Sequence, residues 1–266
     1  MATQTQAVGI ADVLRQWRER QRVSQLELAL RAGTTQRHVS FIERGRSVPG
    51  RGMVVRLAEA LEVPLRERNA MLLAAGFAPA YPESKLDDAQ LSPVRSALER
   101  ILDGHLPYPA VITDRAADLV SANEAFLGLI DGAAPSLCEP HCNVARVLLH
   151  PDGLGPRVVN LDEWGRHVID GLRRKSRRHP EAPLADLIEE LESYVPPRPR
   201  VPAPLHLGFA VPLRLREGDD ELTLLTTLTH FATAIDVTLS ELTLEAFIPA
   251  DAATAAYLSR AGQRPL

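Results

Sequence analysis

The chain has 266 residues, of which 45% are hydrophobic and 24% charged, and its formal net charge is −4 at pH 7. This length and composition predict a folded, soluble protein with two domains of ordinary size. No stretch approaches about 18 uninterrupted apolar residues, and the N-terminus lacks a signal-peptide pattern. These features exclude a membrane-spanning protein and predict a cytoplasmic, nucleoid-associated one if the chain proves to bind DNA.

Charge divides the chain into two unlike parts. Residues 1–85 contain 13 Lys and Arg against 8 Asp and Glu, a net charge of +5, whereas residues 86–266 contain 17 against 26, a net charge of −9. Such asymmetry is typical of a nucleic-acid-binding end attached to a domain of another kind. The proline-containing, polar segment FAPAYPESKLDDAQ separates the two parts. We therefore predict a DNA-binding domain at 1–78, a linker at 79–92 and a second domain at 93–266.

The spacing of apolar residues predicts that the first domain is all-α, with five helices. Longer amphipathic helices are expected at 10–17, 54–61 and 64–75. Between the first two of these, residues 24–45 (SQLELALRAGTTQRHVSFIERG) predict two short helices joined by a glycine turn. Five helices in this order, with the two short ones second and third, favour a helix-turn-helix DNA-binding domain over a generic helical hairpin with solvated faces.

Capping residues mark where the two short helices begin. Ser24 followed by Glu27 is a capping box, so the first helix should start at Gln25, and Thr35 should cap the second. The first helix is expected to bury a stripe formed by Leu26, Ala29 and Leu30.

The second short helix has a polar outer face that suits the major groove of DNA. Arg37 can bind a guanine through O6 and N7, Gln36 can bind an adenine through N6 and N7, and Phe41 can lie against a thymine methyl group. Arg44, Arg46 and Arg51 flank this helix and are either phosphate contacts or ordinary surface arginines.

Residues 24–45 resemble the helix-turn-helix of lambda- and 434-type phage repressors and of Xre-type bacterial regulators, through GTTQ and the I-E-x-G ending. The resemblance implies that Gln25 holds a DNA phosphate and that the positions of Gln36, Arg37 and Phe41 approach the bases. Arg37 and Phe41 differ from the glutamines of the 434-type protein, so the operator sequence does not carry over. The residues expected at the DNA are Ser24, Gln25, Thr34, Thr35, Gln36, Arg37, His38, Ser40, Phe41, Arg44, Arg46 and Arg51.

The second domain is predicted to be α+β. Helices are expected at 92–102, 124–130, 161–178 and 185–194, and residues 144–149 suit either a helix or a strand. Strands are expected at 110–113, 118–122, 207–215, 222–228 and 242–248, and Val237 with Leu239 should continue the sheet. This order is that of a PAS-like domain, in which helices cover one face of a five-stranded antiparallel sheet.

The second domain is similar to the ligand-binding domain of MmyB-like regulators, which in actinobacteria follows a repressor-type domain. The similarity lies in LVSANEAF (119–126), NVARVLLHPDG (143–153) and DVTLSELTLEAFIPAD (236–251), and an aromatic residue frequent in the family is here Ala122. It implies a small hydrophobic, fatty-acid-like effector and control of genes for antibiotic or oxidoreductive metabolism.

The second domain contains the residues that are candidates for binding an effector. Arg146 lies in an apolar run and can pair either with a ligand carboxylate or with a neighbouring acidic residue. The aromatic residues can line a pocket or simply form the core. The full candidate set is Asn123, Phe126, Arg146, Trp164, Phe209, Phe231 and Phe247.

Cys138, His141 and Cys142 form the only cluster with the character of a metal site. A structural metal needs four ligands and no second pair stands out, so we expect neither a metal nor a cofactor. A redox pair and two ordinary thiols remain the alternatives. If the protein were an enzyme, one polar cluster would be the candidate for its active site: Thr226, Thr227, Thr229 and His230.

The sequence therefore predicts a DNA-binding transcription regulator, a homodimer on a palindromic operator, modulated by a small effector. One alternative is a DNA-binding antitoxin or scaffold whose second domain binds a protein. An enzyme tethered to DNA is disfavoured, because no nucleophile elbow, P-loop, dinucleotide motif or metal box is present.

Overall fold

The computed structural model describes residues 9–178, 182–197, 210–231 and 234–262. The chain divides into two compact units. One comprises Met1–Lys85 with Ala232–Ser240, and the other comprises Leu86–Phe231 with Glu241–Leu266. The division near residue 85 falls within the segment predicted as a linker.

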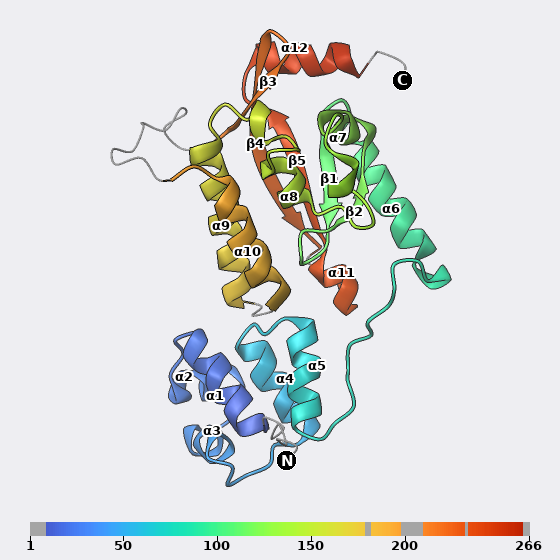
Figure 1. Cartoon of the computed structure of the whole chain (residues 1–266). Helices are drawn as coiled ribbons and strands as arrows, with labels where there is room; N and C mark the ends of the chain where they lie inside the picture. Colours follow the sequence, from blue (N-terminus) through green and yellow to red (C-terminus); the bar gives the residue numbers. More distant parts are fainter. Residues whose placement is uncertain (1–8, 179–181, 198–209, 232–233, 263–266) are drawn as a thin grey trace, which may run out of the picture. The chain divides into compact units, whose positions relative to one another are not determined.

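The first unit contains the five predicted helices, α1 (Ile10–Arg20), α2 (Gln25–Arg31), α3 (Gln36–Glu43), α4 (Arg51–Ala60) and α5 (Leu65–Ala74) (Figure 1). The side chain of Ser24 accepts a hydrogen bond from the Glu27 amide at the start of α2, and Thr35 does the same for His38 at the start of α3. Gly33 turns the chain between them with a φ of 62°, a conformation that costs glycine little. The predicted capping residues are thus confirmed.

The core of the first unit corrects one expectation about α2. Leu28, Ala29 and Ala32 are buried, whereas Leu26 and Leu30 are 53% and 73% exposed. Residues three and four apart share a helix face, so burial of Leu28 and Ala32 turns Leu26 and Leu30 about 200° away, at about 100° per residue. Ala29 was correctly predicted to be buried, and the two leucines were not.

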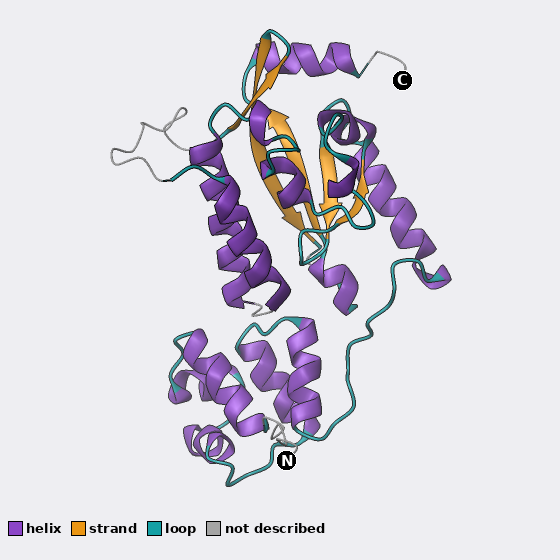
Figure 2. Cartoon of the chain, in the orientation of Figure 1, coloured by secondary structure: helices purple, strands orange, loops and turns teal. Residues whose placement is uncertain are grey.

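The second unit is built on a five-stranded antiparallel sheet in the order β2-β1-β5-β4-β3, which confirms the predicted PAS-like arrangement (Figure 2). Of the predicted strand at 207–215, residues 207–209 lie outside the described residues, residues 210–212 are not in a strand, and residues 213–215 begin β3. The strands are β1 (Ala110–Thr113), β2 (Leu119–Ala122), β3 (Leu213–Glu217), β4 (Asp220–His230) and β5 (Thr243–Pro249).

The prediction for Val237 and Leu239 is wrong, because these residues form a short helix, α11 (Val237–Glu241), rather than a strand. Asp236 begins this helix, since its side chain accepts a hydrogen bond from the Leu239 amide and its carbonyl accepts one from the Ser240 amide. Local capping therefore overrides the apolar alternation that suggested a strand.

Helices complete the second unit. They are α6 (Ser92–Asp103), α7 (Glu124–Leu129), α8 (Val144–Leu149), α9 (Leu161–Arg178), α10 (Ala182–Tyr194) and α12 (Ala252–Ala261). The ambiguous segment 144–149 is helical because the Asn143 side chain caps it at the Arg146 amide. The sequence did not predict α12, which Asp251 caps at the Thr254 amide.

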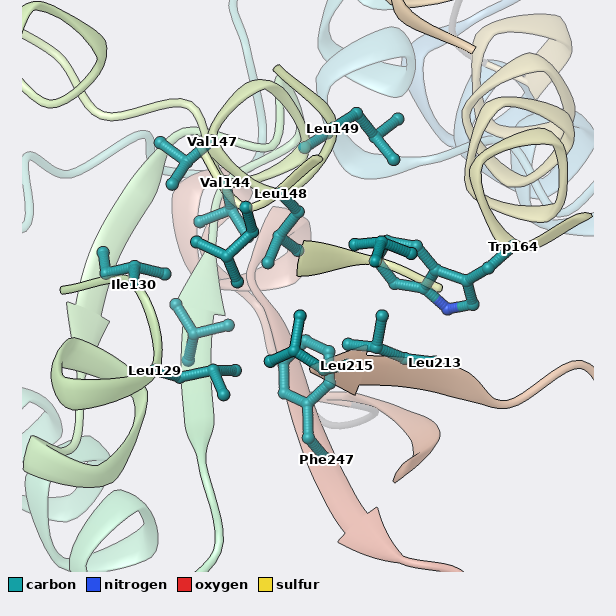
Figure 3. Close-up of a cluster of buried hydrophobic side chains, with 14 of the residues drawn as sticks. Leu129, Ile130, Val144, Val147, Leu148, Leu149, Trp164, Leu213, Leu215 and Phe247 are labelled. Atoms are coloured by element: carbon teal, nitrogen blue, oxygen red, sulfur yellow. The ribbon is translucent and has the colours of Figure 1, made fainter. Parts of the chain in front are cut away.

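Helices α7 to α10 cover one face of the sheet and share a core with it. Figure 3 shows Trp164 of α9, Leu213 and Leu215 of β3, and Phe247 of β5 in a single apolar cluster. Phe126 of α7 stacks on Phe247 with ring centroids 5.9 Å apart. These aromatic side chains therefore hold the helices onto the sheet.

The turn after α8 passes close to the helix backbone. A Cβ atom on Gly155 would lie 2.6 Å from the Leu149 carbonyl oxygen and 2.7 Å from that of His150. A Cβ on Gly153 would overlap the Val147 carbonyl oxygen. Both glycines are therefore needed for close packing in this turn, which explains the ending of the NVARVLLHPDG segment.

Candidate DNA interface and effector domain

The outward face of α3 carries the side chains that sequence analysis assigned to DNA bases. Gln36 and Arg37 are exposed at the start of the helix, and Phe41 is half-buried one turn later. The Arg37 guanidinium lies 5.1 Å from the centre of the Phe41 ring, and that of Arg44 lies 5.6 Å from it on the same helix. Two cations thus flank one aromatic ring on this face.

Two further contacts order the ends of this face. Arg44 donates hydrogen bonds to the Ser40 carbonyl at 3.0 Å and to the Ser40 hydroxyl at 2.7 Å. At the start of α3, Thr34 Oγ1 and His38 Nδ1 are 3.0 Å apart. Several polar side chains of α3 are therefore held in place before any DNA contact, which lowers the entropy that binding must overcome.

A buried carboxylate fixes α3 from behind. Glu43 is only 4% exposed and accepts two hydrogen bonds from Arg18 of α1, at 2.6 and 3.0 Å. It also accepts one from the side-chain amide of Gln25 in α2, at 2.7 Å. The hydrogen bond to Glu43 raises the pKa of Arg18, so the guanidinium stays charged. Glu43 thus ties the first two helices to the third.

Sequence analysis missed the role of Glu43, although the I-E-x-G ending contains it. It assigned Gln25 to a DNA phosphate. In the structure, the side-chain amide of this half-buried residue donates a hydrogen bond to Glu43. The capping residues Ser24 and Thr35 are exposed, as are Arg46 in the α3–α4 loop and Arg51 at the start of α4. 

The candidate effector residues of the second unit are mostly occupied by structural contacts. Phe126, Trp164 and Phe247 are at most 1% exposed within the core. Asn123 caps α7 at the Phe126 amide, accepts from the Ala110 amide, and donates to two carbonyl groups. Phe231 is half-buried, and Phe209 lies outside the described residues.

Arg146 forms the ion pair that sequence analysis gave as its alternative role. Its Nε and Nη2 atoms donate to the two carboxylate oxygens of Glu190 in α10, at 2.6 and 2.7 Å. Tyr194 also donates to Glu190, at 2.7 Å. The hydrogen bond from Arg146 lowers the pKa of Glu190, as expected for a stable two-pronged pair between α8 and α10.

Sequence analysis named Thr226 as part of a polar cluster with Thr227, Thr229 and His230, but it did not anticipate that Thr226 shares the helix-covered face of the sheet with Glu245. Thr226 of β4 pairs with Phe247, and Glu245 lies two residues before Phe247 on β5, so all three side chains share one face. The Thr226 hydroxyl is buried with no hydrogen-bond partner among the described residues. Desolvation raises the pKa of Glu245 to about 7.

Lys175 of α9 lies near this group. Its Nζ atom donates to the Asp114 carbonyl at 3.2 Å, and its charge acts on Glu245. Burial lowers the pKa of Lys175. This lysine belongs to the basic run RRKSRR, residues 173–178. Each residue of a helix turns about 100° from the last, so Lys175 faces the sheet while Arg173 lies about 200° away and pairs with Asp170 and Glu192.

Within the part of the chain that the structure describes, no group of three or more His, Cys, Asp or Glu side chains is arranged to hold a metal ion. A search of the same residues finds no helix with both the length and the apolar character needed to cross a membrane.

A helix-turn-helix unit joined to a PAS-like sheet unit defines the chain as a two-domain regulator with a sensor-type second domain. Residues 14–68 match the helix-turn-helix family model, and residues 94–261 match that of the MmyB-like transcription regulator ligand binding domain. The second match spans more than half of the chain. The protein therefore belongs to the MmyB-like transcription regulators.

One similar curated protein is an uncharacterized HTH-type transcriptional regulator, y4dL, of Sinorhizobium fredii (strain NBRC 101917 / NGR234). The two chains are 48% identical over 56 residues, a segment that covers 21% of this chain and 29% of the relative. Both matched domains are those of transcription regulators. The domain composition of the chain is therefore that of a DNA-binding regulator with a ligand-binding domain, and not that of an enzyme.

Proposed function

We propose that the protein binds a palindromic operator in the cytoplasm as a homodimer, with α3 of each copy in the major groove. The observation that carries this proposal is the ordered outer face of α3, braced from behind by Glu43. Two such helices placed about one DNA turn apart would read two half-sites. Phosphate contacts by Arg44, Arg46 and Arg51 would add affinity that falls as salt rises.

Replacement of Gln36 tests the contact to bases. Gln36→Ala removes an exposed amide suited to adenine, and loss of such a pair costs about 1–3 kcal/mol, or roughly 5- to 150-fold in affinity. Fluorescence anisotropy with a selected operator would measure this loss. Gln16→Ala is the matched control, because Gln16 is an exposed amide on α1. Equal affinity and specificity of the Gln36 variant and wild type would refute this assignment.

We also propose that a small effector binds between the sheet and its covering helices and changes operator binding. The surrounding side chains are largely apolar, whereas Thr226 and Glu245 offer polar groups on the same face. These features support a mainly apolar effector with one polar end. The effector can alter DNA binding only if it binds one arrangement of the regulator more tightly than another.

Native mass spectrometry of protein from its own host separates the sensor from the alternative reading. A retained small molecule, lost in a Thr226→Val variant, supports the effector proposal. A stoichiometric protein partner supports an antitoxin or scaffold instead. The same spectra give the number of chains per particle, and a monomer on operator DNA would contradict the proposed homodimer.

A further inference from the structure

Two cysteines lie side by side in the loop that leads into α8. Cys138 follows the short 3₁₀ turn Pro135–Leu137, and Cys142 precedes the helix cap Asn143. Both are free thiols of intermediate exposure. Their Sγ atoms are 3.6 Å apart, with the thiol of Cys142 donating to the sulfur of Cys138.

This loop is anchored at its ends and open in its middle. The Cys138 amide donates to the Pro135 carbonyl at 2.9 Å, and the Cys142 carbonyl accepts from the Leu119 amide of β2 at 2.7 Å. The three residues between the cysteines, Glu139, Pro140 and His141, are all exposed. A disulfide requires sulfur atoms about 2.05 Å apart, so the two atoms need to approach by about 1.5 Å. The exposed residues between the cysteines can adjust to allow this approach.

The two thiols have different environments. Desolvation, together with the hydrogen bond to Cys138, raises the pKa of Cys142 to about 12. Cys142 therefore keeps its proton and serves as a hydrogen-bond donor to its neighbour. Because the proton of Cys142 is held in its hydrogen bond to Cys138, the Cys138 sulfur is the one positioned to meet an oxidant first, and Cys142, 3.6 Å away, is positioned to resolve the product.

We propose that Cys138 and Cys142 form a site of reversible oxidation, at which a peroxide converts the two thiols into one intramolecular disulfide. The Cys138 sulfur attacks one peroxide oxygen, the O–O bond breaks, and the leaving hydroxide takes up the thiol proton as water. The Cys142 sulfur then displaces hydroxide from the Cys138 sulfenic acid, and its own proton completes a second water. The thiols lose two electrons and two protons, and hydrogen peroxide is reduced to water.

The disulfide would act on the start of α8. Asn143 caps this helix and also donates to the Ala116 carbonyl at 2.9 Å and to the Asp118 carboxylate at 2.8 Å. Its neighbour Cys142 carries the hydrogen bond to β2. A covalent link from Cys142 to Cys138 would therefore restrain the segment that connects β2 to α8.

Hydrogen peroxide added to the reduced full-length protein tests the site. The peptide carrying both cysteines should lose about 2 Da and regain it with dithiothreitol. In Cys142→Ser, the sulfenic acid should persist on Cys138 and be trapped by dimedone, whereas Cys138→Ser should react much more slowly. Circular dichroism checks that both variants fold.

The mass change of the wild-type peptide tests the proposal even if neither variant folds. Thiols that stay unmodified, that form only links between chains, or that proceed to sulfinic acid without an internal disulfide would overturn the proposal. Because the readout is the mass of one peptide, it is independent of operator binding and of any effector.

Discussion

Glu43 is the residue on which the geometry of the DNA-binding face depends most. It is buried and accepts three hydrogen bonds, from Arg18 and Gln25. Removing one member of a buried pair leaves the other charge uncompensated, which costs about 3–5 kcal/mol. Glu43→Ala should therefore destabilise the first unit by about 3 kcal/mol.

Hydrogen exchange of the α1–α3 peptides across a urea series would measure this loss. Glu27→Ala is the control, because Glu27 pairs with Arg31 on the surface and such pairs contribute about 0–1 kcal/mol. Similar effects of the two substitutions would show that the Glu43 cluster does not brace α3.

Glu245 should make the stability of the second unit depend on pH. Its pKa rises from the ordinary 4.5 to about 7, because burial disfavours the carboxylate. Between these two pH values the native state holds a proton that the unfolded chain has lost, so the free energy of unfolding falls as pH rises. Above about pH 7 both states are ionised and this contribution to the slope ends.

Glu245→Gln should therefore flatten the pH dependence between about 4.5 and 7, relative to wild type. Urea unfolding of both proteins at several pH values would give the difference directly. Subtracting the two profiles removes the contribution of Asp114, whose pKa burial also raises. Parallel profiles would mean that Glu245 is not desolvated in the folded protein.

At the scale of elements, the sequence predicted well those helices whose caps and apolar spacing agree. Thr35 marks the start of α3, and Val39 and Ile42 are its buried apolar residues. The sequence prediction failed for Val237 in α11, where apolar alternation suggested a strand but Asp236 caps a helix, and it made no prediction for α12, which Asp251 caps. Capping acts within a few residues and outweighed the apolar alternation on which the strand prediction relied.

The effector candidates show a different limit of sequence reasoning. Composition marks Phe126 and Trp164 as large apolar residues, but it cannot say whether they face a pocket or another side chain. The polar pair Thr226 and Glu245 becomes visible only through the register of β4 against β5, which depends on contacts between distant segments.

The turn after α8 should tolerate no side chain at Gly155. A Cβ atom would meet two backbone oxygens at 2.6 and 2.7 Å, and backbone yields less easily than a flexible side chain. Gly155→Ala should destabilise the second unit by about 2–3 kcal/mol. Thermal unfolding would measure this loss, with Gly128→Ala as control, because Gly128 lies in α7 and an added Cβ atom there would meet nothing within 4 Å.

The control should be neutral or stabilising by up to about 1 kcal/mol, since alanine favours a helix over glycine. If Gly155→Ala behaved like the control, the close approach between this turn and α8 would be wrong.

At the scale of the whole molecule, the protein combines a basic helix-turn-helix unit with an acidic PAS-like unit. The family matches identify a DNA-binding domain and a ligand-binding domain in one chain. The contacts within each unit give it a feature suited to that role. The first unit presents an ordered polar helix, and the second encloses polar groups within an apolar face. The proposed coupling of effector and operator requires both in one chain.

Selection of DNA sites from a random pool by the purified full-length protein tests the central proposal most directly. We expect enriched sequences with two inverted half-sites whose centres lie about 10 base pairs apart, and a changed preference within each half-site for Gln36→Ala. The absence of any enriched sequence, or enrichment of a single unpaired half-site, would contradict a homodimer that reads a palindrome through α3.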